Sequence, residues 1–276
     1  MTQPPRIFDR ALIASHLARR PAARDFVTEL VLADLEDRLG TLIREFPKAL
    51  IIGPVVDQLP THGQTANARF AFERLPAFAD EDEIPAAIGT DYNLIVSILH
   101  LQAVNDVPGY LARLRARLLP DGLLMVATLG GDSLTELREA FLAADAMVLG
   151  GASARVAPML QVRDGGALLQ RAGLALPVAD VETHVVRYGS PLALMAELKA
   201  LGAANPLVER PRRLATPALL AAATDAYQQR DADADGRVRA TLEIIWLAGW
   251  VPHESQQQPL RPGSAKVSMK DALGPH

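Results

Sequence analysis

The sequence feature that most constrains the fold is a unit of a short apolar run, a turn and an amphipathic helix. Tyr92–Leu99 (YNLIVSIL) and Leu123–Leu129 (LLMVATL) are apolar runs of the kind that form strands buried on both faces. Between them, Asp106 and Pro108 are typical of a capped helix start, and Pro120-Asp121-Gly122 is a turn signal. Strands separated by helices predict βαβ units and a mostly parallel sheet, covered on both faces, in an α/β protein.

The N-terminal part of the chain predicts helices followed by a first strand. Residues 6–46 show helical spacing of apolar residues, and Pro21 divides them into two helices. Ala49–Ile52 is a buried strand that ends at Gly53-Pro54. Residues 54–90 form the least regular stretch, with one strand-like patch at 69–72.

The C-terminal part predicts further helices and two more strands. Ser133–Glu136 has the form of a capping box that opens a helix to about Leu149. Ser190-Pro191 and Thr216-Pro217 each pair an N-cap residue with a proline at the first helical position. The remaining predicted elements are a helix at 162–172 closed by Gly173, and strands at 181–188 and 241–250. We expect a helical extension at 1–46, a sheet domain with a late helical insertion at 47–251, and a polar tail at 252–276.

Composition excludes several classes of protein. Apolar residues make up 49% and charged residues 22%, which is typical of a globular chain. The net charge of −4 provides no field for binding nucleic acid. Cysteine is absent, which removes thiolate metal sites and cysteine nucleophiles. The sequence shows neither a signal peptide nor a transmembrane segment, so we expect a cytoplasmic protein, with peripheral membrane contact left open.

The strands and turns together resemble the class I S-adenosylmethionine methyltransferases. Ile51-Ile52-Gly53-Pro54, YNLIVSIL and LLPDGLLMVATLGG carry this resemblance. It implies a Rossmann-like sheet of seven strands, with the cofactor outside the carboxyl ends of the strands.

Longer patches resemble one branch of that superfamily, the complex I assembly factors, whose mitochondrial member is an arginine hydroxylase. They cover VNDVPGYL from Val104, the glycine-rich run through Gly130-Gly131, GGASARVAPMLQVRDGGALLQRAGL, and short N- and C-terminal signatures at Phe8-Asp9-Arg10 and Gly249-Trp250. This resemblance implies a protein substrate or partner, such as a respiratory complex I subunit, that the chain modifies or chaperones.

The resemblance also implies the site residues. The positions that would hold S-adenosylmethionine are Gly53, Asp57, Glu73, Asp80, Glu81, Ser97, His100 and Leu101, and those that would bind substrate are Gly130, Gly131, Arg155, Arg163 and Asp164. The first motif departs from the family pattern, because Gly53 is followed by a proline rather than by further glycines. Gln102-Ala103 replaces the family's His-Trp pair. These departures predict a weakened cofactor site.

Plainer interpretations stand beside these. Gly130-Gly131 also suits an ordinary strand-to-helix turn, Arg155, Arg163 and Asp164 suit ion pairs, and His100 suits a buried histidine. No metal site is expected, since no His-x-Asp/Glu pair occurs, and the run from Asp231 to Gly236 lacks the glutamate that would complete a calcium loop. Three functions remain open: the complex I assembly branch, a methyltransferase of a small molecule or protein, and a non-catalytic binding module.

Overall fold

The computed structural model describes residues 6–21, 25–77 and 87–257. Its centre is a seven-stranded sheet with the strand order β2-β3-β1-β4-β5-β7-β6. The strands are β1 (Ala49–Gly53), β2 (His62–Gln64), β3 (Arg69–Pro76), β4 (Tyr92–Ile98), β5 (Leu118–Leu129), β6 (Ala175–Tyr188) and β7 (Val238–Trp250). The expected α/β class and the Rossmann-like class I methyltransferase sheet are confirmed.

The four central strands β3, β1, β4 and β5 run parallel, whereas β2, β6 and β7 pair antiparallel with their neighbours. No α-helix lies between β1 and β3. The connection holds only a 3-10 turn, η1 (Val56–Gln58), and the short strand β2. The irregular stretch of the sequence is therefore a shortened crossover.

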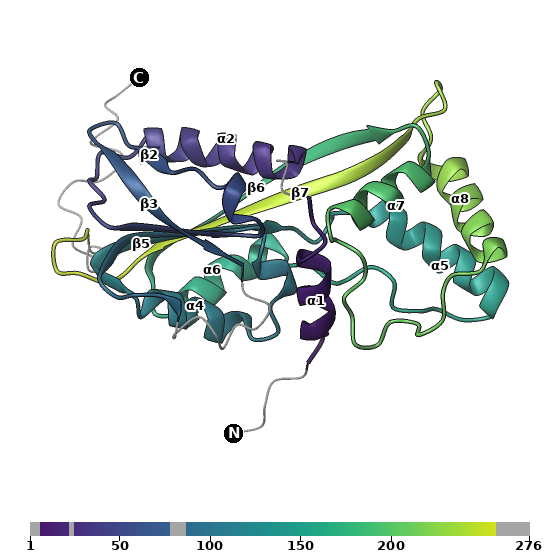
Figure 1. Ribbon diagram of the computed structural model, residues 1–276, viewed down its shortest axis with the longest axis horizontal. Coiled ribbons are helices and arrows are strands. Elements are labelled where there is room, and N and C mark those ends of the chain that lie inside the picture. The colour runs from purple at the N-terminus through teal and green to yellow at the C-terminus, as the bar shows by residue number, and fades with distance from the viewer. Residues whose placement is uncertain (1–5, 22–24, 78–86, 258–276) are drawn as a thin grey trace, which may run out of the picture.

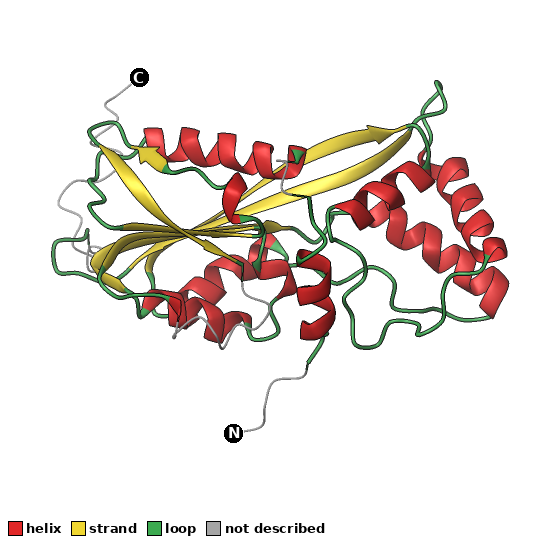
Figure 2. Ribbon diagram, in the orientation of Figure 1, coloured by secondary structure: helices red, strands yellow, loops and turns green. Residues whose placement is uncertain are grey.

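Helices cover both faces of the sheet (Figures 1 and 2). On one face, α2 (Phe26–Gly40) packs against side chains such as Ile51 and Val96. On the other face, α4 (Val107–Arg115) and α6 (Val162–Arg171) pack against Leu50 and Ile95. Successive strand residues point to opposite faces, so both sides of β1 and β4 are buried, as their continuous apolar runs predicted.

A separate lobe of helices lies at one end of the sheet (Figure 2). It contains α5 (Thr135–Leu149), α7 (Pro191–Ala200) and α8 (Pro217–Asp231), with α1 (Arg10–Leu17) beside it. The long strands β6 and β7 extend from the sheet toward this lobe.

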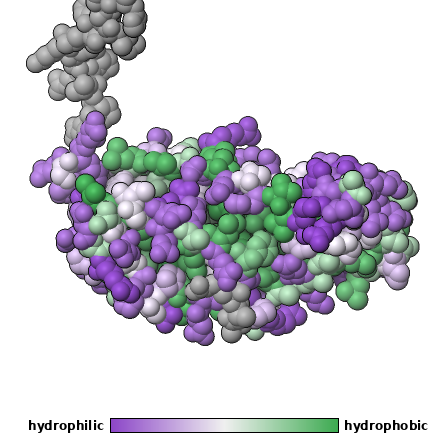
Figure 3. Space-filling view, turned by 90° about the horizontal axis from the view of Figure 1, so that it is seen from above, coloured by the Kyte–Doolittle hydropathy of each residue, from purple (hydrophilic) through white to green (hydrophobic). Residues whose placement is uncertain are grey.

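Apolar side chains gather near the middle of the face seen from above (Figure 3). Within the described ranges, no helix combines the length and the apolar character that crossing a membrane requires.

The predicted helix starts are mostly confirmed by their caps. The side chains of Asp106, Ser190 and Thr216 accept hydrogen bonds from the backbone three residues ahead. The capping box at Ser133 is wrong, although the helix that follows it is correct. Leu134 takes the N-cap position in a left-handed conformation, with φ of 56° and no side-chain cap. The Ser133 hydroxyl instead bonds to the backbone of Glu243 on β7.

Candidate functional site

The candidate site is the edge of the sheet where β1, β4 and β5 end at Gly53, Ile98 and Leu129. In open α/β sheets, ligands bind outside the carboxyl ends of parallel strands. The predicted residues Gly53, His100, Gly130 and Gly131 all follow or end these strands.

The space beside Gly53 is filled by side chains of the protein itself. A Cβ atom placed on this buried glycine would lie 2.6 Å from Leu59 Cδ2 and 3.0 Å from Ile98 Cγ1. Leu59 reaches this position because η1 turns the chain back immediately after β1. Asp57, within η1, is exposed. The turn that would cradle the methionine end of S-adenosylmethionine thus does not fit the cofactor.

Other predicted cofactor residues are engaged within the fold. The Ser97 hydroxyl is buried and lies 2.7 Å from the Tyr110 hydroxyl. The Glu73 carboxylate accepts a hydrogen bond of 2.5 Å from Tyr92, and Glu73 lies level with Leu50 rather than at the carboxyl end of its strand. Leu101 is part of the core. The predicted acidic residues Asp80 and Glu81 lie outside the described residues.

His100, which follows β4, is a buried histidine at the sheet edge. Its ring contacts Tyr110 edge-on, with ring centroids 5.2 Å apart. Within the part of the chain described, Nε2 is buried without a hydrogen-bond partner. Burial lowers the pKa of His100 to about 4. The imidazole is therefore neutral at pH 7 and holds one unsatisfied ring nitrogen.

The glycine pair after β5 makes room for two side chains from elsewhere in the sequence. A Cβ atom on Gly130 would overlap the carboxylate of Glu243, and one on Gly131 would overlap the amide of Gln161. Backbone hydrogen bonds of 2.8 Å tie Gly130 to Glu243 and Gly131 to Leu160. The absence of a side chain at both glycines therefore leaves the space that the Glu243 carboxylate and the Gln161 amide occupy.

Glu243 and Asp132 form a pair of carboxylates at this turn. Glu243 is only 7% exposed, whereas Asp132 is exposed. Burial, followed by the neighbouring charge of Asp132, raises the pKa of Glu243, although hydrogen bonds from the backbone of Asp132 and Gly131 oppose this. Among the described residues, neither carboxylate forms an ion pair with a cation. Two adjacent carboxylates without a counter-ion suit a guanidinium ligand, which donates several hydrogen bonds in a planar fork.

Glu243, Asp132 and Gln161 are not among the site residues that the sequence predicted. Glu243 was detectable, because it is the one charged residue in the otherwise apolar strand TLEIIWLAGW. A lone carboxylate in such a strand requires a partner or a function. Nothing in the sequence indicated that this partner would be the glycine turn after β5.

Of the predicted substrate residues outside the glycine pair, one is used in an internal ion pair and two are exposed. Arg155 forms a two-pronged ion pair with the fully buried Asp145, with the shortest distance at 2.7 Å, so its guanidinium is used within the fold. Arg163 and Asp164 are exposed in the first turn of α6. This turn follows Gln161, which places both residues near the Gly131 side of the site.

The acidic and histidine side chains do not point to a metal centre in the described part of the chain. Within the described ranges, no three or more His, Asp or Glu side chains gather as metal ligands would. In the acidic turn before β7, Asp233 and Asp235 both form ion pairs with Arg187, and Asp233 also pairs with Arg239. These carboxylates are therefore engaged in closing the hairpin.

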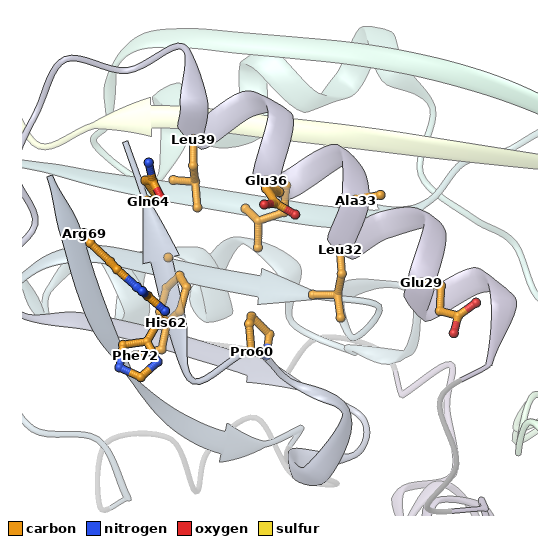
Figure 4. A pocket seen from close by; sticks show the side chains of 12 residues that line it. Glu29, Leu32, Ala33, Glu36, Leu39, Pro60, His62, Gln64, Arg69 and Phe72 are labelled. Carbon is orange, nitrogen blue, oxygen red and sulfur yellow. The ribbon is translucent and has the colours of Figure 1, made fainter. Parts of the chain in front are cut away.

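A pocket of about 540 Å³ lies away from this edge, between α2 and the strands β2 and β3 (Figure 4). Glu29 and Glu36 line it from α2, and His62, Gln64 and Arg69 line it from the strands. None of the residues predicted to bind a cofactor lines this pocket.

Comparison with known proteins identifies close relatives of the chain. It is 34% identical to "Arginine-hydroxylase NDUFAF5, mitochondrial" of Rattus norvegicus over 96% of this chain and 83% of that protein. Identity to the same protein of Danio rerio is 32%, over 90% of this chain and 82% of that protein. No family model matches the chain.

A second group of relatives consists of methyltransferases. The malonyl-[acyl-carrier protein] O-methyltransferase of Halorhodospira halophila is 35% identical over 76% of this chain and 68% of that protein. Among solved structures, the YcgJ protein from Bacillus subtilis aligns with a TM-score of 0.48 and 10% identity, over 82% of this chain and 99% of that chain. From its similarity to the hydroxylases over most of both lengths, the chain belongs to the family of the arginine-hydroxylase NDUFAF5.

Proposed function

We propose that the protein recognises an arginine side chain of a respiratory complex I subunit, and modifies or chaperones that subunit. The observation that carries the proposal is the pair of Asp132 and Glu243, two adjacent carboxylates at the carboxyl edge of the sheet that form no ion pair within the described part of the chain. The relatives are named for action on arginine, and a guanidinium would supply the missing positive charge.

A peptide-binding experiment tests this proposal. A synthetic peptide with one arginine among neutral residues is compared by calorimetry with the same peptide carrying citrulline, which has a similar shape but no charge. We expect the arginine peptide to bind at least about tenfold more tightly, because a desolvated charge pair contributes more than a neutral hydrogen bond. Asp132→Asn and Glu243→Gln should remove this preference.

The matched control is Asp37→Asn. It removes the charge of an exposed carboxylate on α2 that is not part of the candidate site. It should leave the preference for arginine intact. Equal affinity for the two peptides in the unmodified protein would disprove the role of the carboxylate pair. Mass spectrometry of complex I subunits from cells with and without the protein then separates modification from chaperoning.

Methyl transfer is the second candidate, favoured by similarity to the malonyl-[acyl-carrier protein] O-methyltransferases. The filled space beside Gly53 argues against it. Calorimetry with S-adenosylmethionine separates the two functions. We expect no binding at millimolar cofactor, and micromolar binding would restore the methyltransferase. If neither cofactor nor arginine peptide binds, a non-catalytic binding module remains.

We also propose the location and organisation of the protein. It would act in the cytoplasm, with at most peripheral contact with the membrane that holds the respiratory chain. Residues 1–46 would form an extension, 47–251 the sheet domain with α7 and α8 inserted between β6 and β7, and 252–276 a tail. Limited proteolysis followed by mass spectrometry tests these boundaries.

A further inference from the structure

A second and larger cavity lies between α1 and the helical lobe. Its volume is about 780 Å³. It is lined by α1, the first part of α5, the end of α7 and the segment 202–215, and Figure 1 shows α1 beside the lobe. Backbone hydrogen bonds from Asp9 to Pro206 and from Val208 to Ile7 hold the N-terminal segment against this wall. The cavity is thus formed by segments that are far apart in the sequence.

The interior of the cavity is mainly apolar. Leu137 and Phe141 contribute from α5, Met195 and Leu198 from α7, and Val156 from the loop between α5 and α6. Small-molecule sites typically occupy about 300–1,000 Å³ and combine such apolar walls with a few polar groups. The cavity therefore has the size and lining for a ligand with a hydrocarbon part.

Among the described residues that line the cavity, every charged side chain is a cation and none is a carboxylate. The cations are Arg19, Arg155, Lys199, Arg210 and Arg213. Two of these cations are neutralised within the fold, Arg155 by Asp145 and Arg210 by Asp9. In the part of the chain that the structure describes, the other three form no ion pair. They come from three different segments and leave a net positive charge at one cavity.

The buried histidine His16 lines the same cavity, close to these cations. His16 is 9% exposed, and burial lowers its pKa, with further lowering from the charges of Arg19 and Arg210. The neighbouring cations thus disfavour a further positive charge here. An arginine side chain of a substrate would meet the same repulsion, so this cavity is distinct in chemistry from the carboxylate pair.

We propose that this cavity binds a long-chain carboxylate, with its acyl chain between α5 and α7 and its anionic head at Arg19, Lys199 and Arg213. Leu214, next to Arg213 in the wall, is 94% exposed, which places an apolar side chain beside the cations. A concave site of this volume encloses one molecule, which favours a single acyl anion over a membrane surface. The proposal does not depend on arginine recognition.

The test measures binding of hexadecanoate, below its micellar concentration, to the full-length protein. Hexadecanol, which lacks the charge, is the matched ligand. We expect hexadecanoate to bind more tightly, and its affinity to fall as salt is raised, because the attraction between exposed charges is screened. Equal affinity for the two compounds, or no binding of hexadecanoate, would overturn the proposal.

Variants assign the binding to this cavity. Lys199→Gln combined with Arg213→Gln should weaken hexadecanoate binding about five- to tenfold and leave hexadecanol binding unchanged. Ala203→Trp, at an exposed position in the wall, should block both compounds by filling the cavity. Arg171→Gln removes an exposed cation on α6, outside the cavity, and should have no effect.

Circular dichroism of each variant checks that the fold is retained. Binding of the protein to vesicles of phosphatidylcholine with phosphatidylglycerol is measured as well, because an anionic membrane surface could also attract the cations. Binding to these vesicles without binding of monomeric hexadecanoate would replace the proposed ligand with a lipid surface and overturn the proposal.

Discussion

The carboxylate of Glu243, on β7, occupies the position that a Cβ atom of Gly130 would take at the end of β5. This contact joins the last strand of the sheet to the turn at its carboxyl edge. The missing side chain at Gly130 leaves room for this carboxylate, and Glu243 thereby lies next to Asp132.

Replacement of Gly130 by alanine should therefore destabilise the protein. The added methyl group must displace Glu243 or shift the strand, and overpacking of this kind costs about 2 kcal/mol. Thermal unfolding should show a midpoint about 5 °C lower. The control is Gly166→Ala in α6, where a Cβ atom meets nothing within 4 Å. Because alanine favours helices, that variant should be slightly stabilised, by up to about 1 kcal/mol.

Glu243 should make stability fall as the pH rises. Its pKa is raised in the folded state, so the folded protein binds the proton more tightly than the unfolded chain does. Its contribution to stability is therefore full below the unfolded value of 4.5 and declines as the pH rises through the higher folded pKa. Urea unfolding of the unmodified protein and Glu243→Gln between pH 4.5 and 7 measures the difference. If the stability of the two proteins changes equally with pH, protonation of Glu243 does not contribute to the pH dependence.

His100 should have the opposite effect on pH dependence. Its pKa falls from 6.5 to about 4 on folding, so protonation favours the unfolded chain. The stability that it contributes is full above pH 6.5 and is lost as the pH falls to about 4, by roughly 3 kcal/mol. Replacement by phenylalanine should remove this loss from urea unfolding curves at pH 4 to 7. An unchanged slope would mean that the ring is hydrated.

The ion pair of Arg155 and Asp145 should be important for stability rather than for binding. Asp145 is fully buried, and Arg155→Gln leaves its charge without a partner, at a cost of about 3 kcal/mol or more. Arg230→Gln serves as the control, because Arg230 pairs with Glu139 at the exposed surface and its loss should cost less than about 1 kcal/mol. Chemical denaturation compares the two, and equal costs would disprove the distinction.

The elements that the sequence predicted well depend on local interactions. The apolar runs of β1 and β4 specify strands because each buries both faces, and Asp106, Ser190 and Thr216 cap helices through bonds three residues away. Such features are determined by residues close together in the chain, so they can be predicted from the sequence alone. Family membership is likewise evident from short stretches of the sequence.

Only the tertiary structure decided which side chains meet at the candidate site. Ser133 has the residue type and spacing of a capping box, yet β7 takes its hydroxyl for a backbone contact. Gly53 has the form of a cofactor turn, yet Leu59 fills the space beside it. In each case a contact between separate segments competes with the local preference and prevails, because packing and hydrogen bonding in the buried interior outweigh the small energies of local propensity.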